Sequence, residues 1–243
     1  IIDLARRSGH RLMVRLVKGA YWDSEIKRAQ LDGLDGYPVY TRKAHTDVAY
    51  IACARRLLAA PDAVYPQFAT HNAQTLATIH RLAHDAGRSA ADAYEFQCLH
   101  GMGEPLYEQV VGPVDQGGLG RACRIYAPVG RHETLLAYLV RRLLENGANT
   151  SFVNRIADED LPLAQLVEDP VRTVKTLADR EGTVGLPHPA IPLPRALFGA
   201  ERPNSRGLDL ASEATLQSLA RSFTASTTKR WHAEPMLGSE LAH

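Results

Sequence analysis

An arginine in the middle of an apolar segment is the first residue with a chemical implication. Arg15 lies within Leu12-Met-Val-Arg-Leu-Val-Lys18, which has the composition of a buried strand. Removing a guanidinium group from water is costly unless an anion or a polar ligand compensates it. Position alone favours two interpretations equally: Arg15 forms a structural ion pair, for instance with Glu95, or it faces a ligand.

Polar residues and glycines follow four apolar segments at the points where each ends. These exits read Lys18-Gly-Ala-Tyr-Trp22, Thr70-His-Asn72, Leu99-His-Gly-Met-Gly103 and Tyr126-Ala-Pro-Val-Gly130. In a parallel barrel, ligands bind at the carboxyl ends of the strands. Lys18 and the backbone amides that follow it suit a phosphate group. The sequence therefore predicts an anion-binding rim.

Arg141 and Arg142 stand side by side in a predicted helix over residues 133–146. Neighbouring helical positions diverge by about 100°, so both reach one ligand only if it lies against the helix flank. Glu145 is spaced to pair with either arginine, and a solvated, salt-bridged face is the more ordinary interpretation. The alternative is a substrate carboxylate held by two guanidinium groups.

The histidines give weaker signals. His71 and His100 lie at strand exits, but no His-x-x-x-His or His-Glu-x-x-His motif accompanies them there. No metal site is predicted, and a metal-dependent hydrolase using these two residues is a minor alternative. Neither a Gly-x-Ser-x-Gly nor a Gly-x-Gly-x-x-Gly motif follows a predicted strand. The residues thus predict an anionic ligand without specifying a reaction.

Strands that alternate with helices must position these groups. The predicted strands are 12–18, 64–69, 94–99 and 123–129; the predicted helices are 23–30, 47–58 with Asp47 as N-cap, 75–86, 105–111 and 133–146. This alternation predicts an α/β fold with a parallel sheet. One side of the strands is apolar, whereas the other carries polar groups, namely Arg15, Glu95, Gln97 and Arg124. A doubly covered sheet is apolar on both faces, so an arc of a (β/α)₈ TIM-type barrel is favoured over an open sheet.

Composition excludes several classes of protein. The 243 residues carry 28 Lys and Arg against 27 Asp and Glu, and 45% are hydrophobic. The near-zero net charge argues against a nucleic-acid partner, and no apolar run approaches the roughly 20 residues of a membrane-spanning helix. Three widely spaced cysteines, Cys53, Cys98 and Cys123, are expected to be small buried hydrophobes in a reducing compartment. The chain starts inside a helical pattern without Met, so we expect it to be part of a longer sequence.

The character of the chain changes near residue 158. Helical patterns over 162–168 and 171–178 precede Gly185-Leu-Pro-His-Pro-Ala-Ile-Pro-Leu-Pro194, and a further short helix is expected over 210–223. A segment so rich in proline is extended and semi-rigid. We therefore predict two regions: an α/β domain over 1–157 and a helical, Pro-rich connector over 158–243.

Long motifs resemble one known family. They are Val14-Arg-Leu-Val-Lys-Gly-Ala-Tyr-Trp-Asp23, Pro38-Val-Tyr-Thr-Arg-Lys-Ala-His-Thr-Asp47, Phe68-Ala-Thr-His-Asn72, and the stretches 94–107, 124–130 and 135–155. They resemble the proline dehydrogenase domain of the bifunctional PutA (proline utilization A) family over roughly residues 1–157. Residues 158–235 resemble the connector toward the aldehyde dehydrogenase domain of that family.

The resemblance implies a (β/α)₈ barrel in which FAD oxidises L-proline to pyrroline-5-carboxylate by hydride transfer to flavin N5. Arg15 and Tyr126 would be the catalytic residues, with Arg15 near N5 and Tyr126 and Leu99 against the proline ring. Arg141 and Arg142 would clamp the proline carboxylate. The implied FAD contacts are Arg15, Lys18, Gly19, Ala20, Trp22, Thr70, His71, Glu145 and Phe152. Electrons would pass to a membrane quinone, which implies a cytoplasmic protein peripheral to the inner face of the membrane.

The chain departs from the family in length, because it corresponds to the second half of the barrel, from the fifth strand onward. Half a barrel leaves sheet edges unpaired, so we expect this chain alone to be inactive without the missing barrel half. The aldehyde dehydrogenase domain would be a further partner. The alternative is a non-catalytic interaction or regulatory fragment without a bound cofactor.

Overall fold

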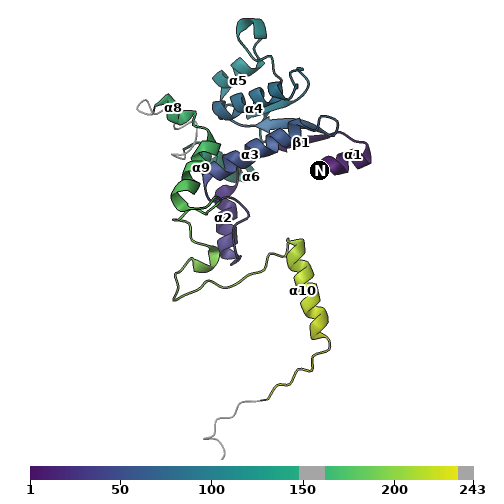
Figure 1. Cartoon of the computed structure of the whole chain (residues 1–243), viewed down its shortest axis with the longest axis vertical. Coiled ribbons are helices and arrows are strands. Elements are labelled where there is room, and N and C mark those ends of the chain that lie inside the picture. Colours follow the sequence, from purple (N-terminus) through teal and green to yellow (C-terminus); the bar gives the residue numbers. More distant parts are fainter. Residues whose placement is uncertain (148–161, 235–243) are drawn as a thin grey trace, which may run out of the picture. The chain divides into compact units, whose positions relative to one another are not determined.

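The computed structural model describes residues 1–147 and 162–234 (Figure 1). It divides into two compact units, one formed by residues 1–23 and 39–191 and the other by residues 24–38 and 192–243. The predicted boundary at residues 157/158 lies outside the described residues and stays a prediction.

A parallel sheet forms the centre of the first unit. Its strands are β1 (Leu12–Leu16), β2 (Val64–Ala69), β3 (Glu95–Leu99) and β4 (Cys123–Tyr126). They pair in the order β1-β2-β3-β4, and all pairs are parallel. The prediction of an α/β fold with a parallel sheet is therefore confirmed. Strand β4 ends before residue 129, where it was expected to end, because Pro128 has no N–H to donate to a neighbouring strand.

Helices follow each of these strands. The first unit contains α1 (Ile2–Ser8), α3 (Lys43–Leu58), α4 (Ala73–Asp85), α5 (Glu104–Val111), the 3₁₀ turn η1 (Val114–Gln116), α6 (His132–Gly147), α8 (Leu163–Leu166) and α9 (Pro170–Glu181). Helix α4 begins at Asn72, whose side chain accepts a hydrogen bond of 2.9 Å from the Thr75 N–H and so caps the helix. Helix α3 begins four residues before Asp47, so the predicted N-cap role of Asp47 is wrong.

The sheet separates an apolar face from a polar one. Phe68, Phe96 and the preceding Tyr94 are fully buried and join the core with residues of α3, α4 and α5. Their rings meet edge to face, with Tyr94 5.8 Å from Phe68 and 5.5 Å from Phe96 between centroids. On the opposite face, register places Arg15 beside Gln67 and Gln97 beside Arg124. Strand alternation therefore sorts the side chains as predicted.

The three cysteines differ in their exposure to solvent. Cys98 is buried and Cys123 is half-buried, with their Sγ atoms 3.6 Å apart. Burial raises the pKa of the Cys123 thiol to about 12, which keeps it protonated at neutral pH. Cys53, however, is exposed on α3, so the expectation that all three are buried is wrong. Cys53 is exposed although Tyr50 and Leu57, about one helical turn before and after it, are buried.

The second unit joins residues 24–38 to the C-terminal part of the chain. It contains most of α2 (Trp22–Leu31), the 3₁₀ turn η2 (Pro194–Ala196) and α10 (Glu213–Ser226). The Asn204 side chain donates to the carbonyl oxygens of Gln30 and Pro194 at 2.8 and 3.2 Å. Gly33 has φ +59°, and a Cβ there would lie 1.8 Å from the Ser205 carbonyl oxygen. Glycine is therefore required where these two segments meet.

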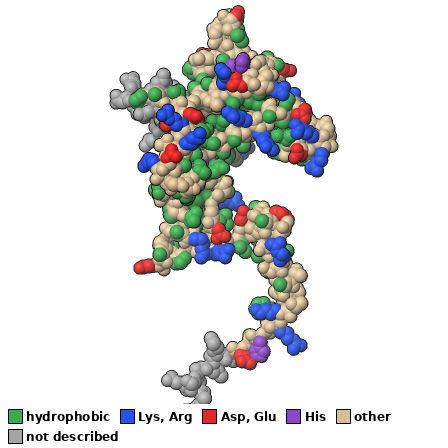
Figure 2. Space-filling view, viewed as in Figure 1, with side chains coloured by type: hydrophobic (Ala, Val, Ile, Leu, Met, Phe, Trp, Pro, Cys, Tyr) green, Lys and Arg blue, Asp and Glu red, His purple; other side chains and the backbone are tan. Residues whose placement is uncertain are grey.

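Several large apolar side chains remain at the surface of the first unit. On α6, the exposed ones are Leu136, Leu139, Val140, Leu143 and Leu144; on the sheet, they include Met13 and Ile125. On the face drawn in Figure 2, hydrophobic side chains lie at the surface among Lys, Arg and acidic residues. Within the described part of the chain, no helix has the length and apolar character needed to cross a membrane.

Candidate functional site

A buried carboxylate organises the polar face of the sheet. Glu95, only 4% exposed, accepts hydrogen bonds from Gln67 Nε2 at 2.6 Å and Gln97 Nε2 at 2.9 Å. Arg124 adds two more at 2.7 and 2.9 Å, one to each carboxylate oxygen. Burial by itself would raise the pKa of Glu95, but the hydrogen bonds from Arg124, Gln97 and Gln67 outweigh it and lower that pKa. Glu95 is therefore ionised at neutral pH.

Arg15 joins this face through an amide. Its Nε donates to Gln97 Oε1 at 3.0 Å, and its guanidinium carbon lies 5.0 Å from the centroid of the Tyr126 ring. Arg15 is exposed on the open side of the sheet. The suggested ion pair between Arg15 and Glu95 is not made, because Arg124 on the adjacent strand β4 occupies both oxygens of that carboxylate.

Arg141 and Arg142 of α6 meet the segment that follows β1. Arg142 Nη2 donates to the Ala20 carbonyl oxygen at 2.7 Å, and its guanidinium carbon lies 5.7 Å from the Tyr21 ring centroid. The Arg141 guanidinium lies 4.7 Å from the same ring. Both adjacent arginines thus reach one loop along the helix flank, as a shared ligand would require. The alternative partner, Glu145, has a side chain outside the described residues.

His71 lies at the exit of β2 and contacts the exit of β3. Its Nε2 accepts a hydrogen bond of 3.1 Å from the Leu99 N–H, which leaves the proton of the neutral ring on Nδ1. Burial lowers the pKa of His71, and the nearby charge of Arg142 lowers it further. Thr70 is buried beside it, and its carbonyl oxygen accepts from the Tyr107 hydroxyl.

Tyr126 is where these groups converge. Burial raises the pKa of its phenol, while the charges of Arg15 and Arg142 oppose that rise. Leu99 is the register partner of Tyr126 on β3. Contacts therefore link Arg15, Tyr126, Leu99 and His71 at the carboxyl ends of the strands. Arg142 binds the segment after β1, and its charge acts on His71 and Tyr126. Such a cluster offers two cations, one neutral imidazole and an aromatic face to a ligand that is anionic at one end.

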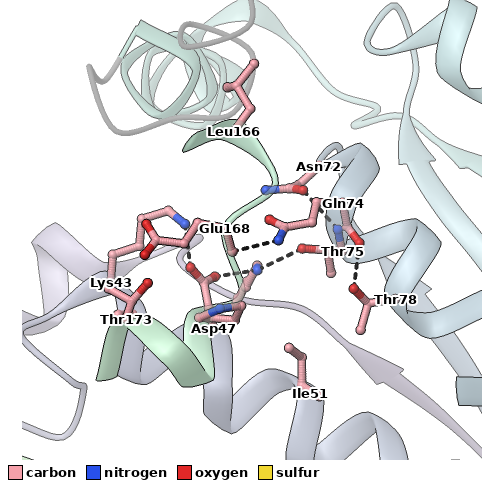
Figure 3. Close-up of a pocket in the computed structure, with 13 residues that line it drawn as sticks. Lys43, Asp47, Ile51, Asn72, Gln74, Thr75, Thr78, Leu166, Glu168 and Thr173 are labelled. Carbon is pink, nitrogen blue, oxygen red and sulfur yellow. Dashed lines mark hydrogen bonds and ion pairs between the residues drawn. The ribbon is translucent and has the colours of Figure 1, made fainter. Parts of the chain in front are cut away.

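Lys18 lies in a pocket of its own, bounded by α3, α4 and residues 166–173. Its Nζ is 2.5 Å from Asp47 Oδ1 and 3.1 Å from Thr75 Oγ1, while Lys43 Nζ reaches Asp47 Oδ2 at 2.6 Å. The pocket, about 180 Å³ in volume, is lined on the α4 side by Asn72, Gln74 and Thr75 (Figure 3). The Lys18 ammonium is thus turned toward a carboxylate, which differs from the phosphate contact expected from sequence.

The remaining predicted site residues are Gly19, Trp22 and Phe152. Gly19 has φ +79° and open space where a Cβ would stand, so a ligand can approach its backbone. Trp22 Nε1 donates to the Tyr40 carbonyl oxygen at 2.8 Å. Phe152 lies outside the described residues. Among residues 1–147 and 162–234, no three His, Cys, Asp or Glu side chains converge as metal ligands would.

Two functional candidates were missed. Gln97 was assigned to the polar side of its strand but given no role, although it links Arg15 to Glu95. Asp47 was expected to cap a helix, although it binds both Lys18 and Lys43. The same signal in the sequence could have found both residues. Each is a polar residue on an element expected to lie near a strand or strand exit that carries a charged side chain.

Comparison with known proteins identifies the family of this chain. The family model described as proline dehydrogenase matches residues 1–155. The chain belongs to the proline dehydrogenase family. The resemblance stated from sequence is confirmed, including its PutA character: the bifunctional protein PutA of Klebsiella aerogenes is 68% identical over 242 residues, and that of Escherichia coli strain K12 is 67% identical over 242.

Solved PutA structures share the fold of this proline dehydrogenase family member. A mutant of Bradyrhizobium japonicum proline utilization A gives a TM-score of 0.77 at 51% identity and covers 91% of this chain and 21% of that one. The structure from Bdellovibrio bacteriovorus inactivated by N-propargylglycine gives 0.74 at 33% identity and covers 93% of this chain and 21% of that one. This chain spans 18% of the length of the two curated relatives above, each of which matches 100% of it.

The neutral state of His71 can be tested by titration. Because burial and Arg142 lower its pKa, we expect the imidazole to stay neutral at pH values where an ordinary histidine, with a pKa of 6.5, is half protonated. The unfolded state then binds more protons than the native one, so His71 disfavours folding increasingly as the pH falls below 6.5. An NMR titration of the ring checks this. Arg142→Met should raise the pKa of His71 and Arg141→Met should leave it in place; equal responses would contradict the assignment.

The Lys18–Asp47 pair predicts unequal effects of removing its two members. Asp47→Ala leaves the Lys18 ammonium, whose side chain is 18% exposed, without its carboxylate; we expect a loss of about 2 kcal/mol of stability. Lys18→Met leaves Asp47 paired with Lys43, so it should cost less than about 1 kcal/mol. Thermal unfolding of both variants of the complete protein, followed by hydrogen exchange over residues 43–58, measures the difference. An equal loss for the two variants would show that Asp47 does not compensate Lys18.

Proposed function

We propose that this chain is the second half of a (β/α)₈ proline dehydrogenase barrel within a longer PutA-type protein, and that this longer protein oxidises L-proline to pyrroline-5-carboxylate. The observation that carries the proposal is the position of Arg15 beside Tyr126 at the carboxyl ends of the strands, with Arg142 bound to the segment that follows β1, in a chain of the proline dehydrogenase family. Proline has a carboxylate at one end and an apolar ring at the other, and both kinds of group have partners in this cluster.

The residues fit FAD as the cofactor. Arg15 is exposed on the polar face, and Glu95, the carboxylate that would otherwise neutralise it, is bound by Arg124. The backbone at Gly19 is open to a ligand, and Trp22, Thr70 and His71 lie at the same strand exits. Bound FAD would supply the oxidant, accepting a hydride at flavin N5. Glu145 and Phe152 stay predicted FAD contacts, and Lys18 is a phosphate ligand only if it turns from Asp47.

The residues of this chain would bind proline and orient it for oxidation. Arg141 and Arg142 hold the carboxylate of proline through charge-assisted hydrogen bonds, which fixes the direction of the ring. Tyr126 and Leu99 pack against that ring and exclude water from it. Arg15 holds a positive charge at the position where the oxidant gains electrons, which favours its reduced form. Alignment supplies much of the rate, because a bound hydride donor needs no further orientation.

The half-barrel assignment is supported by the open polar face and by apolar side chains at the surface. Met13 and Val17 lie on the same side of β1 as Arg15 and are 59% and 41% exposed, and Leu143 on α6 is 70% exposed. No strand among the described residues pairs with the outer edges of β1 and β4. A second barrel half would bury these groups and edges. The PutA relatives are bifunctional, so an aldehyde dehydrogenase domain is a further proposed partner.

Reduction of bound flavin by proline tests the function. The complete protein should carry FAD, and L-proline should bleach its visible absorbance without oxygen. Absence of FAD, or flavin that proline fails to reduce, would overturn the proposal in favour of a non-catalytic interaction or regulatory role. Residues 1–243 alone should retain little FAD and show no proline:dye reductase activity; robust turnover would contradict the half-barrel. A quinone acceptor, and with it a cytoplasmic location at the inner membrane face, is proposed from the family and is tested by adding quinone-containing vesicles.

A further inference from the structure

Gln97 is a buried amide with partners of opposite kinds on its two ends. A side-chain amide has an oxygen that only accepts and a nitrogen that only donates. The nitrogen of Gln97 donates to Glu95 Oε1 at 2.9 Å, and its oxygen accepts from Arg15 Nε at 3.0 Å. Turning the amide over would put its oxygen against a carboxylate and its nitrogen against a guanidinium donor. The charge of Glu95 therefore fixes which end of Gln97 faces Arg15.

The Glu95 carboxylate, which orients the Gln97 amide, is itself held in place. Glu95 and Gln97 are 4% and 5% exposed, so neither side chain has room to turn. Gln67 Nε2 and two nitrogens of Arg124 also donate to the Glu95 carboxylate, and the Tyr65 hydroxyl lies 3.5 Å from its Oε2. The Tyr107 hydroxyl of α5 shares its one proton between the carbonyl oxygens of Thr70 and Gln97, the latter at 3.1 Å, so the Gln97 backbone lies against α5. A rigid chain of contacts thus runs from Glu95 through Gln97 to an exposed arginine.

We propose that Gln97 and Glu95 are positioning residues for Arg15, holding its Nε so that its two terminal nitrogens keep a fixed direction beside Tyr126. The inference rests on the proposed function, in which Arg15 faces the flavin. A flexible arginine on an open sheet face would lose much of its effect on a neighbouring group, because favourable electrostatics depend on charges placed before the reaction.

Gln67 provides a matched control. It is a buried glutamine on the same face, 8% exposed, and it donates to the same oxygen of Glu95 at 2.6 Å. Only Gln97 also accepts from Arg15. Gln97→Met and Gln67→Met therefore remove equivalent amides and leave equivalent gaps around Glu95, but only the first releases Arg15.

The experiment compares both variants in the FAD-loaded complete protein. In Gln97→Met, we expect flavin reduction by proline to slow by about tenfold, since the lost hydrogen bond has a charged donor, and the flavin midpoint potential to shift. Gln67→Met should stay within about twofold of the unsubstituted protein on the same basis. Crystal structures of the two variants should show Arg15 displaced only in the first. Equal effects of the two substitutions would overturn the proposal.

Arg15→Met separates this inference from the proposed function. If Arg15→Met leaves the flavin potential and reduction rate unchanged, Arg15 does not act on the flavin, and the Arg15 role in the proposed function fails, taking this inference with it. If Arg15→Met changes both and Gln97→Met changes neither, only the positioning role fails. If the positioning role is right, adding Gln97→Met to Arg15→Met should produce no further change.

A shorter amide keeps the test decisive if methionine at position 97 prevents folding. Gln97→Asn retains a polar group but is one methylene too short to span Glu95 and Arg15, and Gln67→Asn is its control. We expect the same asymmetry in potential, in reduction rate and in the position of Arg15. Similar values for these two asparagine variants would overturn the proposal as well.

Discussion

Arg142→Met in the complete protein is expected to raise the KM for L-proline by about 100-fold with a much smaller change in kcat. A hydrogen bond between charged partners contributes about 1.5–3 kcal/mol, which corresponds to a factor of about 10 to 100. The carboxylate is bound equally in the ground state and the transition state, so its loss appears mainly in KM. The increase in KM should be larger for Arg142→Met than for Arg141→Met, because Arg142 also donates to the Ala20 carbonyl oxygen at 2.7 Å.

Pyrrolidine, which has the ring of proline without the carboxylate, identifies the cause. If the two arginines bind the carboxylate, the preference for proline over pyrrolidine should collapse in Arg142→Met and in Arg141→Met. Arg142→Lys is the conservative control: it keeps the charge but loses the fork geometry, so it should recover only part of the affinity. An unchanged preference for proline in both methionine variants would refute the carboxylate clamp.

Glu95→Leu is expected to lower the local stability of the sheet by about 3 kcal/mol. It leaves the buried amide nitrogens of Gln67 and Gln97 without their acceptor, and each unsatisfied donor costs about 1–3 kcal/mol. Arg124, whose side chain is 58% exposed, turns to water and adds little. Hydrogen exchange of the backbone amides over residues 95–99, measured in the complete protein, gives the loss directly.

The acid response of the unsubstituted protein offers an independent check on Glu95. Its native pKa lies below the ordinary 4.5, so the native state binds fewer protons than the unfolded state between the two values. The contribution of Glu95 to stability is therefore complete above about pH 4.5 and is lost as the pH falls through the lowered pKa.

Tyr65→Phe is the control for Glu95→Leu. The Tyr65 hydroxyl is 3.5 Å from Glu95 Oε2 and should contribute less than about 0.5 kcal/mol to stability. Protection that is as high in Glu95→Leu as in Tyr65→Phe would contradict the role of this carboxylate.

Alternation along the strands was enough to predict which residues share the polar face. The period of two places Arg15, Glu95, Gln97 and Arg124 on one side wherever a strand forms, and the structure has them there. The partner of Arg15 was not predictable in the same way. The register aligns Arg15 with Glu95 through Gln67 on β2, but Arg124 binds both oxygens of Glu95, and Arg15 bonds to Gln97 instead.

Helix boundaries limited what could be predicted at the Lys18 exit. The sequence placed Lys18 at the carboxyl end of a strand over 12–18, and β1 ends at Leu16. It started the helix over 47–58 at Asp47, whereas the structure starts that helix at Lys43. That difference moves Asp47 from a capping position into the helix, where its side chain reaches Lys18 and Lys43. Asp and Ser-type residues favour helix starts locally, and a long-range ion pair overrides that preference here.

The β1-β2-β3-β4 order of the sheet also affects how the chain can fold while it is being synthesised. Each strand finds its hydrogen-bonding neighbour in the next one to leave the ribosome, so pairing can advance in step with translation. No early strand has to wait for a distant one to be inserted between it and its neighbour, which keeps the search for native contacts comparatively local. In a nascent chain, the amide groups of β3 would therefore begin to acquire protection before β4 has been made.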